Sequence, residues 1–238
     1  MRLPTRVAAT VLAETFALVS RARAAKSLHP RGVVHEAELR VHGGDGGRPD
    51  LLAGVPWLTM PASHAGVVRF SRSLGLPERA PDIHGLALRL VGAHGPGLDQ
   101  DLLMVTSGDG LLVHHLFVPG RGYFDRPYSS VLPYRGTGGR FVVGARLAPA
   151  APRPPGAGSE FADLGAAAAT GRLAFEVGVA PIRGRLTPVA TLAVGARLPD
   201  EENALHFNPW NTGGGLHPAG SVNALRDRVY RRSQRGWD

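Results

Sequence analysis

The stretch Val33-Val-His-Glu-Ala-Glu-Leu-Arg-Val-His42 carries the clearest structural signal in the chain. Apolar and charged side chains alternate along it, and a period of two is typical of a β-strand with one buried face. Alternation or a short apolar run recurs in six further segments: 84–91, 101–106, 111–118, 140–147, 172–179 and 187–198. Short strands at close spacing predict a β-barrel or a β-sandwich.

The composition supports a strand-rich globular protein. The chain has 238 residues, of which 43% are hydrophobic and 19% are charged, and this balance is typical of a folded domain. Its 32 glycines and 20 prolines argue against a helical bundle and favour many turns. Cysteine is absent, which excludes disulfides, Cys-ligated zinc, iron–sulfur clusters and a thiolate nucleophile.

Helices are expected at three places. The spacing of apolar residues predicts an amphipathic helix over about 5–25, a short helix over 161–169 and a final helix over about 219–235. A signal peptide is the alternative for the first segment. It is disfavoured because Glu14 interrupts the apolar stretch and Arg21 lies where a cleavage region should be neutral.

The chain is expected to form one domain over 1–238, with a Pro-rich surface loop at 148–159. No apolar run reaches the roughly 20 residues of a membrane span. The net charge is +8, but Lys26 is the single lysine among 27 basic residues. So strong an arginine bias is typical of genome composition rather than of nucleic-acid binding, so we expect no nucleic-acid partner and a cytoplasmic protein.

Most standard catalytic motifs are missing. The sequence has no Walker loop, nucleophile elbow, zinc-protease motif or dinucleotide fingerprint. His114 and His115 would face opposite sides of the predicted strand 111–118, so they are not expected to share a metal. His84 and His94 have no evident partner and are expected at the surface.

The final helix holds a more informative pair. Arg226 and Tyr230 are four residues apart and therefore neighbours on one helix face. A guanidinium beside a phenol favours the phenolate, which is the form that binds ferric iron. The default interpretation remains a tyrosine packed on the core beside a solvated arginine.

Seven segments in order change that default, because together they resemble the haem-dependent catalase superfamily. Val67-Val-Arg-Phe-Ser71 is similar to the Val-Arg-Phe-Ser stretch of that family. The other segments are Lys26–Gly32, Asp82–Arg89, Asp101–Leu102, Pro133–Gly136, Phe207–Trp210 leading to His217–Asn223, and Arg226 with Tyr230. Two of these segments, Pro133–Gly136 and the one that begins at Phe207, resemble the short, catalase-related haem proteins of bacteria rather than full-length catalases.

The resemblance implies an α+β fold, namely a closed antiparallel β-barrel with flanking helices in a catalase-like minimal core. It also implies haem b (iron protoporphyrin IX) between the barrel and the final helix. Tyr230 would be the axial metal ligand, supported by Arg226. Arg69 would contact a haem propionate, and Lys26 would supply a second propionate charge. The structural alternative for Arg69 is a solvated side chain that contacts no haem.

On the other side of the haem, the resemblance implies that His29 is the acid–base residue and that Ser71 holds its imidazole. Each also has a structural alternative, a loop histidine and a strand-end hydroxyl. Members of the family with catalase activity have an asparagine over the iron. Val105 or Thr106 takes that place here, depending on the alignment, and Thr106 could partly substitute for the lost amide.

The missing amide and the short chain favour a haem-dependent, catalase-like peroxidase that activates a peroxide or organic hydroperoxide and acts on an organic substrate, with weak catalase activity, or an enzyme that rearranges the hydroperoxide. Alternatives are a biosynthetic enzyme that catalyses a non-peroxide rearrangement or dehydration, and a non-catalytic haem-binding protein. A homodimer is one assembly compatible with the sequence.

Overall fold

The computed structural model describes residues 31–44, 49–74, 76–77, 80–110, 113–154, 156 and 158–219. The predicted helices at about 5–25 and 219–235 lie outside these residues, apart from Ala219.

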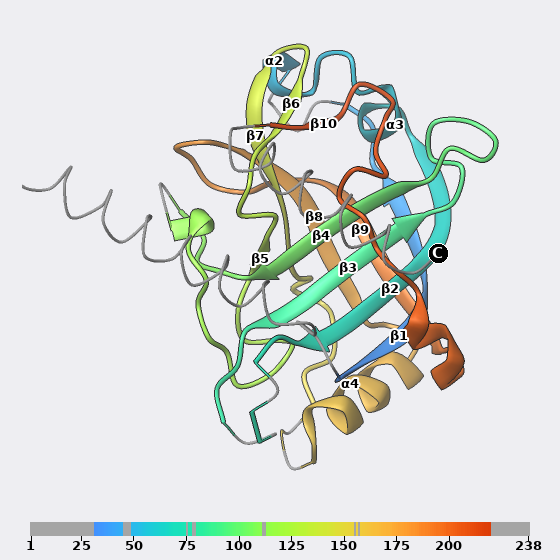
Figure 1. Cartoon of the computed structure of the whole chain (residues 1–238), viewed down its shortest axis with the longest axis vertical. Helices are drawn as coiled ribbons and strands as arrows, with labels where there is room; N and C mark the ends of the chain where they lie inside the picture. Colours follow the sequence, from blue (N-terminus) through green and yellow to red (C-terminus); the bar gives the residue numbers. More distant parts are fainter. Residues whose placement is uncertain are drawn as a thin grey trace, which may run out of the picture.

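Within the described residues, eight strands form a closed ring (Figure 1). The ring runs β1–β2–β3–β4–β5–β7–β8–β9 and closes from β9 back to β1, and every pairing is antiparallel. The strands are β1 (Arg31–Val41), β2 (Ala62–Arg72), β3 (His84–Leu90), β4 (Gln100–Thr106), β5 (Tyr128–Ser129), β7 (Gly139–Leu147), β8 (Ala174–Pro181) and β9 (Thr187–Arg197). The predicted closed antiparallel barrel is therefore confirmed.

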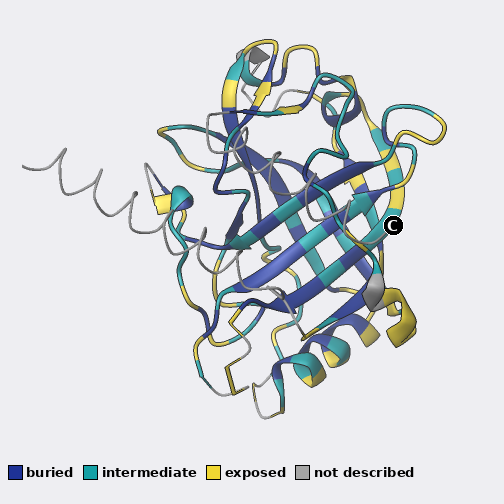
Figure 2. Ribbon diagram, viewed as in Figure 1, coloured by how far each residue is buried: buried dark blue, intermediate teal, exposed yellow. Residues whose placement is uncertain are grey.

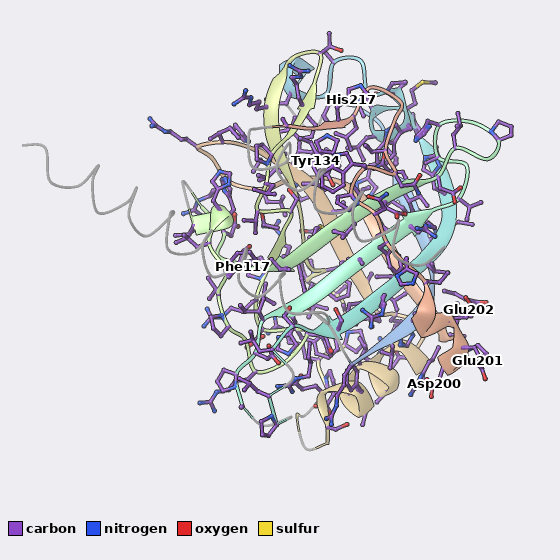
Figure 3. All side chains as sticks on the ribbon, in the orientation of Figure 1. Phe117, Tyr134, Asp200, Glu201, Glu202 and His217 are labelled. Carbon is purple, nitrogen blue, oxygen red and sulfur yellow. The ribbon has the colours of Figure 1, made fainter. Side chains whose placement is uncertain are left out.

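Two short strands extend the sheet beyond the ring. β6 (Tyr134–Gly136) pairs with β7, and β10 (His217–Pro218) pairs with β6. Figure 3 shows Tyr134 and His217 close together at this end of the molecule.

Helices flank the barrel. They are α2 (Pro49–Leu52), α3 (Pro56–Thr59) and α4 (Glu160–Ala169), with 3-10 turns η1 (Val113–His115) and η2 (Asp200–Ala204). The Ser159 side chain accepts a hydrogen bond from the Ala162 N–H and caps α4, which packs at the lower end of the barrel in Figure 1. The acidic side chains of η2 point away from the barrel in Figure 3. The predicted helix at 161–169 is confirmed, and the described part of the loop 148–159 holds neither helix nor strand.

The core lies inside the ring, where alternate residues of each strand meet (Figure 2). In β1, Leu39 and Val41 are buried whereas Glu36 and Arg40 are exposed, as the alternation predicts. Side chains from opposite walls fill the interior: Val33, Leu39, Val68, Phe70, Leu86, Leu88, Leu102, Phe175 and Leu192. Burying this apolar surface is the main stabilising contribution to the barrel.

The predicted strand over 111–118 is wrong. The Val113 N–H bonds to the Gly110 carbonyl and the Leu116 N–H to the Val113 carbonyl, both at 3.1 Å. These i to i+3 bonds form η1 in place of a strand ladder. His114 and His115 therefore do not face opposite sides, and their Nε2 atoms are 3.0 Å apart.

The expectation of a surface position is wrong for His84. His84 is fully buried, because it lies on the interior period of β3 beside Leu86. His94 is half-buried, and its ring packs where a side chain at Gly213 would lie.

His35 gives the barrel a testable pH dependence. Its Nδ1 lies 3.1 Å from the Gly195 carbonyl, to which it donates. Burial lowers the pKa of His35 below its ordinary value of 6.5, and the positive charge of Arg197 lowers it further. The hydrogen bond to the Gly195 carbonyl raises this pKa but does not outweigh the two. The unfolded chain therefore takes up the proton first as the pH falls, so this contribution to stability is present above about pH 6.5 and is lost below it.

The variant His35→Asn retains a hydrogen-bond donor near the Nδ1 position but does not titrate. When the pH falls from about 7.5 to about 5, we expect its free energy of unfolding to decrease less than that of the wild type. Urea unfolding at the two pH values measures the difference. His42→Asn is the matched control, because His42 is exposed. Equal losses in the wild type and in His35→Asn would contradict the assignment.

Candidate functional site

The outer surface of β1–β4 brings together three of the predicted site residues, Arg69, Ser71 and Val105, in two parallel rows. We call it the outer face, and it consists of Gly32, Val34, Arg69, Ser71, Gly85, Ala87, Leu103 and Val105. The strand register aligns Gly32, Ser71, Gly85 and Val105 in the first row and Val34, Arg69, Ala87 and Leu103 in the second. Directly paired residues project to the same side of a sheet. The two rows therefore share one surface, and β2, β3 and β4 lie side by side at the front of Figure 1.

The centre of the outer face is flat because its side chains are small. Gly32 and Gly85 have none, and Ala87 adds one methyl group. Neighbouring strands are about 4.8 Å apart, so four strands span about 14 Å. On this side of the sheet Val34, Ser71 and Gly85 are buried, whereas Ala87, Leu103 and Val105 are half-buried.

Gly32 makes room for one of those polar groups. A Cβ atom at Gly32 would lie 2.7 Å from Cζ and from Nη2 of Arg69, so the guanidinium lies across the glycine on the outer face. Burial lowers the pKa of Arg69, yet a guanidinium stays protonated in proteins. Arg69 therefore places a fixed positive charge at the edge of an apolar surface.

Ser71 and Val105 flank Gly85 in the first row. The Ser71 side chain is buried, whereas Val105 is half-buried and adds no hydrogen-bonding group. In this register Val105, not Thr106, shares the surface with Ser71.

Thr106 lies on the opposite side of β4. It is fully buried in the barrel interior, and its Oγ1 accepts a hydrogen bond of 3.1 Å from the His84 N–H. The structure therefore does not bring Thr106 together with Arg69, Ser71 and Val105.

A loop segment closes one border of the outer face. Arg89 binds Asp101 through two hydrogen bonds of 2.7 Å and donates a third, of 2.8 Å, to the His206 carbonyl. Its Cζ lies 5.3 Å from the Phe207 ring centroid. The Asn208 N–H donates to the same Asp101 carboxylate at 2.7 Å. These contacts anchor the Phe207–Trp210 motif beside the two rows.

A buried ionic cluster, which was not predicted from the sequence, is formed by Arg72, Asp82, His84 and Glu160. Arg72 Nε lies 3.2 Å from Asp82 Oδ2, and Arg72 Nη1 lies 2.8 Å from Glu160 Oε1. His84 Nε2 donates to Glu160 Oε2 at 2.8 Å. The available signal was positional, since Arg72 and His84 fall on the interior period of β2 and β3.

The ionic cluster ties separate elements together at the end of the barrel. Arg72 also donates to the Pro77 and Ala80 carbonyls, at 3.1 and 3.0 Å, and Glu160 is the first residue of α4. The cluster thus fixes the connection between β2 and β3 and docks α4, directly behind Ser71.

The other predicted site residues, Lys26, His29, Arg226 and Tyr230, lie outside the described residues. Among the residues that the structure describes, no group of three or more His, Cys, Asp or Glu side chains could hold a metal ion. No helix in this part of the chain is long and apolar enough to cross a membrane.

The closed barrel and its strand order define a catalase-like fold. A solved structure of a bacterial catalase matches this chain with a TM-score of 0.59 at 14% sequence identity. The match covers 92% of this chain and 59% of the catalase chain. No protein-family model and no curated protein sequence matches the chain.

Proposed function

We propose that the protein is a haem-dependent oxidoreductase that activates a peroxide or organic hydroperoxide and oxidises an organic molecule, with weak catalase activity. The observation that carries this proposal is the outer face of a catalase-like barrel, on which Arg69 and Ser71 share one side of the sheet with the small residues Gly32, Gly85 and Ala87. When bound, haem b supplies the redox chemistry, while the protein sets its orientation, ligation and access.

The described residues fit a haem in shape and in charge. The four strands span about 14 Å, a width that suits a flat macrocycle, and the Arg69 guanidinium lies where a side chain at position 32 would begin. Arginine binds carboxylates through a planar fork, so Arg69 is suited to a propionate at the edge of the porphyrin. Lys26 would supply a second charge for propionate binding.

The residues outside the described ranges complete the proposal. Tyr230 would ligate the iron as a phenolate, which Arg226 favours by its positive charge. His29 would take the proton from the peroxide and return it to the leaving oxygen, which is general acid–base work. Ser71 would orient the imidazole of His29.

An absorption spectrum of the full-length protein with added haem tests the ligand. We expect a high-spin ferric spectrum typical of tyrosinate ligation, which is lost in Tyr230→Phe because a phenyl ring has no oxygen to bind iron. Tyr134→Phe is the matched control, since Tyr134 is buried at the β6–β10 end and its variant should keep the spectrum. Failure to bind haem, or an unchanged Tyr230→Phe spectrum, would overturn the proposal.

Stopped-flow absorbance with an organic hydroperoxide tests the acid–base role. His29→Ala is expected to slow the reaction by about 10²–10⁴-fold, the usual contribution of a positioned acid–base group, whereas His42→Ala should react normally. A haem complex that reacts with no peroxide would instead support the non-peroxide rearrangement or the non-catalytic haem-binding function.

Val105 provides a separate prediction. Val105→Asn adds an amide donor in the same row as Ser71, where it could hydrogen-bond a bound peroxide. We expect hydrogen peroxide turnover to rise by about tenfold or more, since one well-placed donor contributes at least this much in other active sites. Oxygen release measures the rate. Leu103→Asn is the control because it adds the same amide in the second row, and equal effects of the two variants would contradict the prediction.

A further inference from the structure

The turn η1 brings two imidazoles into direct contact away from the outer face. The Nε2 atoms of His114 and His115 are 3.0 Å apart, and the ring centroids are 4.3 Å apart. Adjacent residues in a strand could not meet in this way, so the contact depends on the 3-10 geometry of η1.

The hydrogen bonds around this pair leave an excess of lone pairs. His115 Nδ1 lies 2.7 Å from the Val131 carbonyl, and because a carbonyl only accepts, Nδ1 carries the hydrogen. In the neutral ring, His115 Nε2 then has a free lone pair. The Ile182 carbonyl oxygen lies 3.3 Å from the same Nε2. The Nε2 atoms of His114 and His115 and the Ile182 carbonyl oxygen therefore lie close together. While both rings are neutral, these three atoms share at most one proton, which comes from His114.

The state and position of His114 suit metal binding. The side chain is buried, and burial, followed by the proximity of His115, lowers the pKa of His114 against hydrogen bonds to the carbonyls of Ile182, Gly110 and Gly184, which favour the protonated ring. His114 lines a small, partly open hollow together with Pro127 and Leu186. Asp109 lines the same hollow, but its carboxylate faces Arg146 at 3.9 Å and accepts a hydrogen bond from the Leu186 N–H.

We propose that His114 and His115 bind one divalent transition-metal ion through their Nε2 atoms. The His115 Nδ1–H bond to Val131 is the outer contact that orients a ligating imidazole. Water from the hollow would fill the remaining coordination positions.

The distance between the two nitrogens selects the kind of metal. With metal–nitrogen bonds of about 2.0–2.1 Å, a separation of 3.0 Å gives an N–metal–N angle of about 91–97°. A tetrahedral site would need the nitrogens about 3.3–3.4 Å apart at the same bond lengths. Adjacent positions of a square-planar or octahedral site fit better, which favours Cu²⁺ or Ni²⁺ over Zn²⁺.

Calorimetric titration of the full-length protein with Ni²⁺ tests the proposal. We expect one equivalent to bind, with at least tenfold weaker binding in His114→Asn and in His115→Gln. The control His42→Gln removes an exposed imidazole whose Nε2 contacts Thr191 and should leave this affinity unchanged. No binding by the wild type, or equal binding by all variants, would overturn the proposal.

A measurement on the unaltered protein covers the case in which a variant fails to fold. Pulsed electron paramagnetic resonance with one equivalent of Cu²⁺ should detect two equatorial imidazole nitrogens, and a single imidazole would overturn the proposal. The copper signal is distinct from that of ferric haem, so the result is independent of the proposed function.

Discussion

Arg72→Met is expected to lower the free energy of unfolding by about 3–5 kcal/mol, the usual effect of removing one partner from a buried ion pair. Arg72, Asp82 and His84 are fully buried, so water cannot stabilise the charges that remain. The variant leaves the carboxylates of Asp82 and Glu160 in the barrel without the cation between them. The Pro77 and Ala80 carbonyls also lose their donors.

Urea unfolding at neutral pH measures this loss. Arg40→Met is the control, because Arg40 also pairs with a carboxylate, that of Glu38, but both are exposed. Such a pair is screened by solvent, so its removal should leave the free energy of unfolding nearly unchanged. A loss of less than about 1 kcal/mol in Arg72→Met would show that the cluster does not stabilise the barrel.

Ala87→Trp is expected to abolish stoichiometric haem binding while leaving the barrel folded. Ala87 lies in the middle of the outer face, paired with Arg69 on one side and Leu103 on the other. An indole there would stand out from the sheet and keep a flat macrocycle from approaching it. The barrel interior is untouched, because Ala87 points away from the buried Leu86 and Leu88.

Haem titration followed by absorbance measures the effect, and circular dichroism confirms the fold. Ala65→Trp places the same side chain at an exposed outer position of β2, beyond the two rows, and should bind haem as the wild type does. If Ala87→Trp binds haem with the wild-type spectrum, haem does not lie on this surface.

The fold could be predicted from the sequence where one face of a strand is continuously buried. The segments over β1, β3, β4 and β7 show this pattern, and their predicted bounds differ from the structure by no more than two residues at either end. β2 was not predicted as a strand, because none of its residues from Ala62 to Gly66 is buried. Closure of the barrel depends on long-range pairing, as between β7 and β8, that a local pattern does not encode.

The candidate site was predictable only in part for a similar reason. Arg69, Ser71 and Val105 were identified from motifs, but their shared surface follows from the register of three strands. Thr106 is the next residue after Val105 and faces the interior, because successive side chains of a strand alternate. The ionic pairing of His84 was missed because its partner Glu160 lies 76 residues away in the chain.

Ring closure also limits how this protein can associate. A sheet that ends in open strands offers unpaired backbone groups to which another chain can add. Here both edges of β1 are paired, one with β2 and the other with β9, and the pairing of β7 with β8 completes the ring. Among the described strands, β10 is the last strand of the extension beyond the ring, and it is only two residues long. So short an edge is a poor template, which protects the molecule against aggregation by strand addition there.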